Sequence, residues 1–300
     1  MDRRKVVCSG IAVLDRNYDL AALPFRPGKV IARGYREVGG GMAATAAVAI
    51  SRLGGEVVWC GRLGRDAVGE TLLAMLRRHG VDTRGATVTE GARSPTSGIL
   101  VDAEGERILA VFSGERLPED APLDPAWLNG AGAVLGDPRW ITGAERLFAA
   151  AAARGIPRVL DAEISPEGVL ARLVPQADHV VFSEHGLASF AGTAEPEAGL
   201  ARVAPGLGAV AAVTLGARGS LWWLGGRIVA VPAPGIAARD TTGCGDVFHG
   251  AFALRLAEGA DVLDAARFAT ATAALKAMNG EGWDGMPDRA AVAAMLARMP

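Results

Sequence analysis

The chain has 300 residues, of which 50% are apolar and 21% charged, and its formal net charge is −2. This composition is typical of a globular protein, and so small a net charge argues against a nucleic-acid-binding surface. No apolar run reaches the ~18 residues of a membrane span. We therefore expect a cytoplasmic protein with neither a membrane partner nor a nucleic-acid partner.

The basic and metal-binding residue types exclude two further classes. Of the 31 basic residues only three are lysine, namely Lys5, Lys29 and Lys276. A Walker phosphate loop needs Gly-Lys-Ser/Thr, whereas Lys29 stands between Gly28 and Val30. The three cysteines are scattered and the four histidines lack metal-binding spacing, which argues against a zinc enzyme. Any phosphate must then be bound by backbone amides, arginine and a metal ion.

Short β-branched runs alternate with alanine-rich helical segments along most of the chain. Six of these runs are expected to be buried strands: Val6–Val13, Glu56–Cys60, Ala133–Gly136, Arg158–Asp161, His179–Phe182 and Ala209–Thr214. A helix is expected at Asp66–His79, because Asp66 is a suitable N-cap and Gly80 ends the apolar repeat. This alternation predicts an α/β fold, a mostly parallel sheet with helices on both faces, in one domain spanning residues 1–300.

Two stretches depart from this alternation and contain strands without helices. Residues 14–38 are polar and carry two prolines before a strand-like run. Residues 95–113 contain two apolar runs around Ala103-Glu104-Gly105, which predicts a β-hairpin. We expect these stretches to form a small β-sheet lid that covers a site and excludes water from it.

Three consecutive glycines, Gly39, Gly40 and Gly41, precede a helix of very small residues. A glycine turn leaves backbone N–H groups available for a ligand, whereas small side chains also permit close helix packing. The pattern is not GxGxxG, so it does not indicate a dinucleotide. Ligand binding and tight packing both remain open interpretations of these residues.

A second motif, Thr214-Leu-Gly216-Ala-Arg-Gly219, follows the last of the expected buried strands. Open α/β sheets bind ligands at the carboxyl ends of their strands, where this hydroxyl and these glycines lie. The same residue types also make an ordinary turn, so this motif alone does not establish a site.

The most specific motif runs from Asp240 to Asp246 as Asp-Thr-Thr-Gly-Cys-Gly-Asp. The apolar residues after it predict a buried helix, so that Gly243, Cys244 and Gly245 form a tight turn at its N-terminus. Unpaired N–H groups and the helix dipole make such a turn an anion site that needs no lysine. Asp246 then suits a general base beside a bound phosphate, although a structural N-cap is the plainer interpretation.

Together the three motifs resemble, in order and spacing, the ribokinase/PfkB family of carbohydrate kinases over essentially the whole chain. The resemblance implies a ribokinase-like three-layer α/β/α sandwich with a β-sheet lid that also forms a homodimer interface. It implies a sugar substrate and the cofactors ATP and Mg²⁺. It leaves a requirement for a monovalent cation such as K⁺ open.

The resemblance also implies roles for single residues. Asp246 would be the catalytic base, and Gly243, Cys244 and Gly245 would bind the migrating γ-phosphate. The residues implied to bind the sugar are Asp15, Arg16, Gly39, Gly40, Gly41 and Thr45, together with Asp246. The residues implied to bind the nucleotide are Ser183, Thr214, Gly216, Gly219, Gly245 and Thr270.

Two positions depart from the family pattern. The magnesium-associated Asn-x-x-Glu motif reads Ser183-Glu184-His185-Gly186 here, so Glu184 is the expected metal ligand from the neighbouring position. Thr45 replaces an asparagine of the glycine-helix motif. The sulfofructose kinases within the family are similar to this chain in both replacements.

Further stretches resemble the same branch: Gly10-Ile11, Asp15-Arg16, residues 37–41, Arg139-Trp140, residues 182–184 and residues 246–250. Lys29 and Arg139 match side chains that bind the sulfonate there, and lysine and arginine suit an anionic tail. Val111 stands where an asparagine is expected, which leaves a different anionic or a neutral sugar open.

The sequence thus predicts an ATP-dependent sugar kinase that phosphorylates a primary hydroxyl of an anionic ketose such as sulfofructose. One alternative is a neutral-sugar or nucleoside kinase of the same family. Another is a catalytically silent regulator that binds a sugar or a nucleotide. An NAD-dependent oxidoreductase is disfavoured, because no dinucleotide fingerprint follows the first strand.

Overall fold

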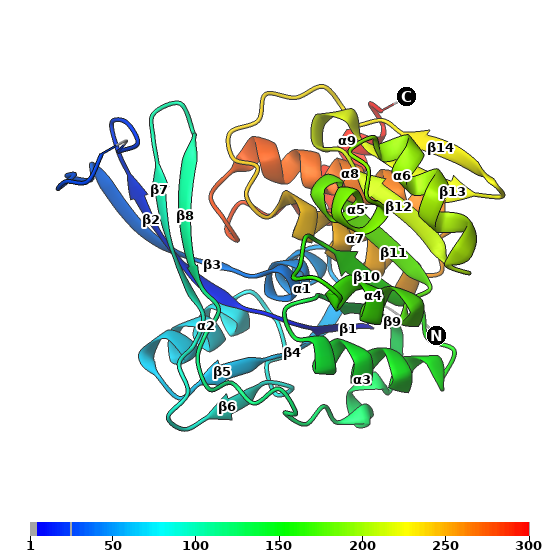
Figure 1. Ribbon diagram of the computed structural model, residues 1–300, viewed down its shortest axis with the longest axis horizontal. Coiled ribbons are helices and arrows are strands. Elements are labelled where there is room, and N and C mark those ends of the chain that lie inside the picture. Colours follow the sequence, from blue (N-terminus) through cyan, green and yellow to red (C-terminus); the bar gives the residue numbers. More distant parts are fainter. Residues whose placement is uncertain (1–4, 25, 300) are drawn as a thin grey trace.

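Eight strands form the central sheet of the computed structural model, which describes residues 5–24 and 26–299 (Figure 1). They are β1 Lys5–Ser9, β4 Glu56–Cys60, β9 Ala131–Gly136, β10 Arg158–Ala162, β11 His179–Ser183, β12 Val210–Thr214, β13 Ser220–Leu224 and β14 Arg227–Val231. Their order across the sheet is β14-β13-β12-β11-β10-β9-β1-β4. The strands from β4 to β12 pair in parallel, and β13 and β14 join antiparallel at one edge. Every residue of β9 is buried, as expected for a parallel strand covered on both faces.

Helices pack on both faces of this sheet, which confirms the predicted α/β/α sandwich. One face carries α1 Met42–Arg52, α2 Ala67–Arg78, α7 Cys244–Ala257, α8 Val262–Asn279 and α9 Arg289–Leu296. The other carries α3 Ile141–Ala152, α4 Val169–Leu173, α5 Glu184–Ala191 and α6 Pro196–Val203. Short 3₁₀ turns occur at Pro125–Leu128, Val174–Gln176, Ala204–Gly206 and Gly216–Arg218. Within the described residues, none of the helices has the length and apolar character needed to span a membrane.

A second sheet of four strands stands beside the central one, at the left of Figure 1. Its strands are β2 Val13–Asp19, β3 Gly34–Gly40, β7 Thr96–Val101 and β8 Arg107–Phe112, in the order β3-β2-β7-β8. Strands β7 and β8 form an antiparallel hairpin, and β2 pairs in parallel with β7. The two stretches that the sequence sets apart therefore meet in one sheet. Two further short strands, β5 Arg62–Gly64 and β6 Thr87–Thr89, pair with each other.

The expected first strand, Val6–Val13, is wrong as a single element. The chain ends β1 at Ser9 and starts β2 at Val13, so that one strand belongs to each sheet. The break falls at Gly10, whose φ is +155°; a Cβ there would lie 2.0 Å from the Asp137 carboxylate. The other five expected strands and the helix after Asp66 are confirmed, and the Asp66 side chain accepts a bond from Gly69 N–H as its cap.

A buried carboxylate joins the segments around this break. Asp137 follows β9 and has no exposed surface. Its oxygens accept hydrogen bonds from the backbone N–H groups of Ile11 at 2.9 Å, Ala43 at 3.0 Å and Arg139 at 2.8 Å. Burial raises the pKa of Asp137, although these three hydrogen bonds oppose the rise. Asp137 thereby fixes the turn between β1 and β2 against the start of α1.

Candidate active site

The glycine turn before α7 has the predicted geometry. Gly243 is the N-cap of α7 with φ +73°, a left-handed conformation that favours glycine. Cys244 N–H donates to Thr241 O at 3.2 Å and Val247 N–H donates to Gly243 O at 2.9 Å, which closes the turn. A Cβ on Gly245 would meet no atom within 4 Å, so space is open beside the first helical turn. The N–H groups of such a turn have no partner within the helix and favour an anion.

Asp246 lies in the first turn of α7 and is partly buried. Burial raises the pKa of Asp246 well above the ordinary value, and the negative charge of Asp161 in β10 raises it further. The charges of Asp137 and Glu163 act in the same direction, whereas His249 lowers the pKa. A carboxylate with a raised pKa is a stronger proton acceptor than an exposed aspartate.

His249 lies one turn after Asp246 and joins α7 to the central sheet. Its Nδ1 lies 2.7 Å from Gly245 O and 3.3 Å from Asp161 Oδ2, and its Nε2 lies 3.1 Å from Val181 O. Burial lowers the pKa of His249, although the two carbonyl contacts oppose that change. The ring thus fixes the first turn of α7 over β10 and β11.

The second sheet contributes Asp15 and the glycines at the end of β3. Asp15 Oδ1 accepts a hydrogen bond from the Ser97 hydroxyl at 2.5 Å, and burial raises the pKa of Asp15. A Cβ on Gly40 would lie 2.1 Å from Asp15 Oδ2, and a Cβ on Gly39 would lie 2.2 Å from the Trp283 ring. These two positions therefore need glycine for close packing around Asp15. Gly41 is the N-cap of α1 with φ +90°.

Thr45 lies between the starts of α1 and α7 rather than on an open surface. It is 4% exposed, and its hydroxyl accepts a hydrogen bond from Trp283 Nε1 at 3.0 Å. Its methyl group would lie 3.3 Å from a Cβ on Gly243. The structure thus places Thr45 beneath the glycine turn. Because its hydroxyl oxygen already accepts from Trp283, the predicted contact with a sugar depends on the hydrogen that this hydroxyl can still donate.

Arg16 is not brought together with Asp15. Successive side chains of a strand point to opposite faces, so Arg16 lies on the other face of β2. There it pairs with Glu37 at 3.0 Å. Its predicted role in sugar binding therefore has no geometric support.

The two residues predicted to bind an anionic tail lie in different surroundings. Arg139 follows β9 and is exposed, and its backbone N–H donates to Asp137. Its positive charge lowers the pKa of Asp137 and of Asp161. Lys29 is exposed in the irregular segment between β2 and β3. Val111 on β8 is 62% exposed and pairs with Ser97, on the face that carries Asp15.

The predicted nucleotide-binding residues lie at the carboxyl ends of two neighbouring strands. Ser183 ends β11 and caps α5; its hydroxyl accepts from Gly186 N–H and donates to Glu163, both at 2.9 Å. Thr214 ends the adjacent β12, and its hydroxyl donates to Phe182 O at 3.4 Å. Gly216 and Gly219 have φ values of +56° and +86° in the turn that follows.

Thr270 is placed differently. It is 5% exposed in the middle of α8, and its hydroxyl donates to Ala266 O at 2.8 Å within the helix. Its hydroxyl therefore already has an acceptor, and a contact with adenine would fall to the rest of the side chain.

Glu184, the predicted magnesium ligand, accepts a hydrogen bond from Arg218 at 2.5 Å. Among residues 5–24 and 26–299, no three His, Cys, Asp or Glu side chains converge as a metal site. Mg²⁺ is usually held by one or two carboxylates together with substrate phosphates, so such a cluster is not required. The carboxylates of Glu184 and Glu163 are oxygen donors of the type that Mg²⁺ prefers.

Sequence reasoning did not identify Asp137, Asp161 or Trp283 as parts of this site. Each is brought there by contacts between segments far apart in the chain. One signal was available, because Asp137 and Asp161 both fall at the carboxyl ends of strands predicted to be buried, where open α/β sheets place functional groups.

The chain is similar to known proteins over nearly its whole length. The family model for pfkB family carbohydrate kinase matches residues 3–288. The ribokinase of Bacillus subtilis is 29% identical, with 89% of this chain and 90% of that protein covered. A crystal structure from Agrobacterium tumefaciens, provisionally assigned as a ribokinase, is 35% identical with a TM-score of 0.94 and covers 98% of this chain and 97% of its own. Arabidopsis thaliana ribokinase complexed with ribose and ATP is 25% identical with a TM-score of 0.86, covering 97% and 98%.

The two glycines of the turn are expected to differ in what they contribute to stability. In Gly243→Ala a side chain would adopt the left-handed φ of +73° and approach Thr45, so we expect urea titration to show a free energy of unfolding lower by about 1–2 kcal/mol. Gly245→Ala is the matched control: its φ is not positive and its Cβ meets no neighbour, so stability should be retained. Equal losses in both variants would contradict this account of the turn.

Proposed function

Because the chain belongs to the PfkB family of carbohydrate kinases, we propose that it transfers the γ-phosphate of ATP to a primary hydroxyl of a sugar. The observation that carries the proposal is the start of α7, where a glycine turn with open space beside it precedes the partly buried Asp246. The turn offers N–H groups to the transferring phosphoryl group and Asp246 offers a proton acceptor in the same helical turn, which supports the proposal. The ribose and ATP bound by the Arabidopsis relative support the two substrates.

In the proposed reaction the sugar lies between Asp15 on the second sheet and Asp246 on α7. Asp246 accepts the proton of the hydroxyl, whose oxygen attacks the γ-phosphorus in line. The new sugar O–P bond forms as the bond between the γ-phosphorus and the bridging oxygen breaks, and ADP leaves. The N–H groups of Gly243 and Gly245 stabilise the charge on the transferred group, whereas that of Cys244 already donates to Thr241 O.

Mg²⁺ is the proposed divalent ion, with the carboxylates of Glu184 and Glu163 as candidate ligands besides the phosphates. When bound, it would supply positive charge to the β- and γ-phosphates. Whether K⁺ is also required is decided by comparing rates in KCl and in NaCl.

The three cysteines are free thiols, as is common in reducing compartments, which supports a cytoplasmic location.

An anionic ketose such as sulfofructose is the proposed substrate. Support comes from Arg139, whose positive charge lowers the pKa of Asp137 and of Asp161, and from Lys29 in the irregular segment between β2 and β3. Val111 contributes no hydrogen bond at a position on the substrate-facing side of the sheet. The known ribokinase and fructokinase relatives make a neutral sugar the alternative. A regulator without catalysis would bind these ligands but release no ADP.

Substitution of the proposed base should separate binding from chemistry. Asp246→Asn cannot accept the proton, so we expect kcat to fall about 10²–10⁴-fold while the Kd for Mg-ATP stays nearly unchanged. Coupled ADP-release kinetics and calorimetry measure the two quantities. Asp264→Asn, an exposed aspartate in the first turn of α8, is the matched control and should retain full turnover. Turnover preserved in Asp246→Asn would refute the assignment.

The same base determines the pH profile of the natural enzyme. Asp246 acts when deprotonated, and burial and Asp161 raise its pKa. Activity should therefore be constant at high pH and fall as the pH drops through that raised pKa, well above the ~3.9 of an ordinary aspartate. A kcat/KM that stays flat down to that ordinary value would contradict the raised pKa.

A substrate panel tests the anionic tail. We expect the highest kcat/KM for sulfofructose among sulfofructose, fructose 6-phosphate, fructose, ribose, 2-keto-3-deoxygluconate and adenosine. Loss of a charged hydrogen-bonding partner in Arg139→Ala should raise KM for sulfofructose about 10–100-fold and change KM for fructose little. Arg154→Ala, an exposed arginine just after α3, is the control. Equal effects on both sugars would remove Arg139 from tail recognition and leave the kinase assignment standing.

A homodimer through the second sheet is the proposed assembly. Apolar side chains remain exposed on its strands and the connecting loop: Val30, Ile31, Tyr35, Ile108, Leu109 and Val111. Strand alternation places Leu109 and Val111 on the face that carries Asp15 and Tyr35 and Ile108 on the other, and exposed apolar side chains of this kind are typical of an interaction surface. We expect light scattering after size exclusion to give twice the chain mass, and Leu109→Glu to give a monomer. A monomeric natural chain at micromolar concentration would contradict the proposal.

A further inference from the structure

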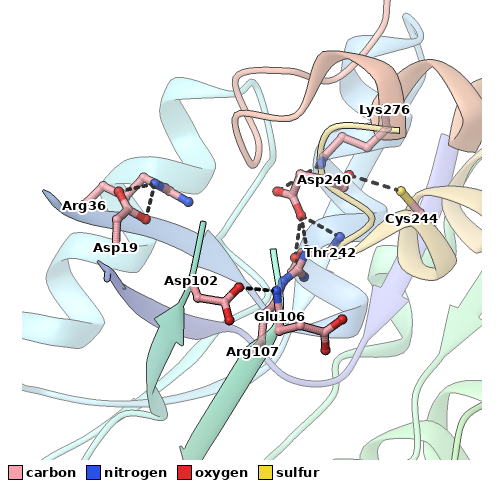
Figure 2. Close-up of polar contacts among 9 residues, drawn as sticks. All are labelled: Asp19, Arg36, Asp102, Glu106, Arg107, Asp240, Thr242, Cys244 and Lys276. Atoms are coloured by element: carbon pink, nitrogen blue, oxygen red, sulfur yellow. Dashed lines mark hydrogen bonds and ion pairs between the residues drawn. The ribbon is translucent and has the colours of Figure 1, made fainter. Parts of the chain in front are cut away.

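The first residue of β8, Arg107, reaches from the second sheet to the loop that precedes α7 (Figure 2). Its Nη2 donates to Asp240 Oδ1 at 2.9 Å, and its Nη1 donates to the hydroxyl of Thr242. The side chains of Arg107 and Asp240 are only 26% and 27% exposed. A two-pronged arginine contact of this kind fixes direction as well as distance.

Asp240 is held in place by further contacts. The N–H and the hydroxyl of Thr242 donate to Asp240 Oδ1 at 2.9 and 2.7 Å. Lys276 Nζ lies 4.0 Å from Asp240 Oδ2; this side chain is 1% exposed, and its ammonium has no hydrogen-bond partner among the residues that the structure describes. Burial would raise the pKa of Asp240, but the Thr242 hydrogen bonds and the charges of Lys276 and Arg107 outweigh it and hold the pKa below the ordinary value. Asp240 is therefore a fixed anion at the start of the glycine turn.

Arg107 is also held in place within the second sheet. The turn before it is ordered by Asp102, whose Oδ1 accepts from the N–H groups of Glu104 at 3.1 Å and Glu106 at 2.8 Å. Strand β8 pairs with β7, which pairs with β2, so that Val111 lies opposite Ser97 and Ser97 opposite Asp15. Arg107 thus belongs to the same hydrogen-bonded sheet as the proposed sugar ligand Asp15 and lies on the same face of it.

We propose that Arg107 is a positioning residue that holds the phosphate-binding turn against the sugar-binding sheet, so that occupancy of one side stabilises the arrangement of the other. The inference rests on the proposed kinase function. Arg107 has no role in proton transfer; it acts through Asp240 and Thr242. Such coupling is reciprocal. If the Arg107 contact stabilises the arrangement that binds both the sugar and the nucleotide, binding of either ligand strengthens binding of the other.

The test compares Arg107→Met and Arg107→Lys with a matched control on the same sheet. In the control, Arg36→Met, the lost partner is Asp19, whose Oδ1 and Oδ2 lie 2.9 and 3.0 Å from Arg36 Nη1. That pair joins β3 to β2 and does not reach the α7 loop (Figure 2). Thermal unfolding identifies any general loss of stability, so that kinetics can be measured well below the unfolding midpoint of each variant.

In kinetics with the best sugar of the panel, Arg107→Met should lower kcat/KM about 10–100-fold, the usual effect of losing a hydrogen bond to a charged group. Arg107→Lys should recover part of this loss, since it keeps the charge but not the two-pronged contact. Arg36→Met should match the natural enzyme. A kcat/KM in Arg107→Met equal to that of Arg36→Met would overturn the proposal, as would a loss explained by unfolding alone.

Amide hydrogen exchange gives a readout that needs no turnover. Mg²⁺ with AMP-PNP should slow exchange of residues 107–112 in the natural chain and in Arg36→Met, but not in Arg107→Met at saturating nucleotide. Equal protection in all three would overturn the coupling even if the enzyme is active. Absence of turnover on every sugar, with protection of β8 still dependent on Arg107, would instead count against the proposed function and leave the positioning role intact.

Discussion

A single buried carboxylate sets the relative positions of the segments that make up this site. Asp137 has no exposed surface and accepts three backbone N–H groups, from the turn after β1, the first turn of α1 and the loop after β9. Each of those N–H groups would be costly to leave unpaired in the interior, so the three segments have few alternatives to meeting there. The glycine at position 10 follows from the same constraint, because a side chain would occupy the space of the carboxylate.

That arrangement concentrates negative charge at the carboxyl edge of the sheet. Burial raises the pKa values of Asp161 and Asp246, and the charge of Asp137 raises both further, as that of Asp161 does for Asp246. His249 and Arg139 offset only part of it. Clustered carboxylates repel one another, so such a site favours binding of a proton or a cation. A general base and a metal–nucleotide complex both depend on this property. The repulsion between these buried carboxylates thus also raises the pKa of Asp246, on which its proposed role as a base depends.

The sequence was sufficient for the fold and for the residues that act through local geometry. Parallel strands, the capped helix after Asp66 and the glycine turn at Gly243 all follow from patterns a few residues long. Asp137, Trp283 and Arg107 were beyond it, because their partners lie 94, 238 and 133 residues away. Arg16 illustrates a local limit: strand alternation places it on the face of β2 opposite Asp15, where it pairs with Glu37, so a motif carried over residue by residue needs to be checked against the two faces of its strand.

In the proposed reaction the second sheet binds the sugar and the start of α7 binds the phosphate, so the two must be held in a fixed relative position. The second sheet continues directly from β1 through Gly10, and β3 leads into α1 through Gly41, so both connections pass through glycines with positive φ that Asp137 and the close backbone packing fix. At the opposite end of the sheet, the β7–β8 hairpin would be free to move if it were held only by these connections. The contact of Arg107 with Asp240 adds a point of attachment at this end, on the loop that precedes the glycine turn. A second sheet attached at both ends can hold a reacting hydroxyl in line with a phosphate and exclude water. A sheet attached at one end alone is less able to do so.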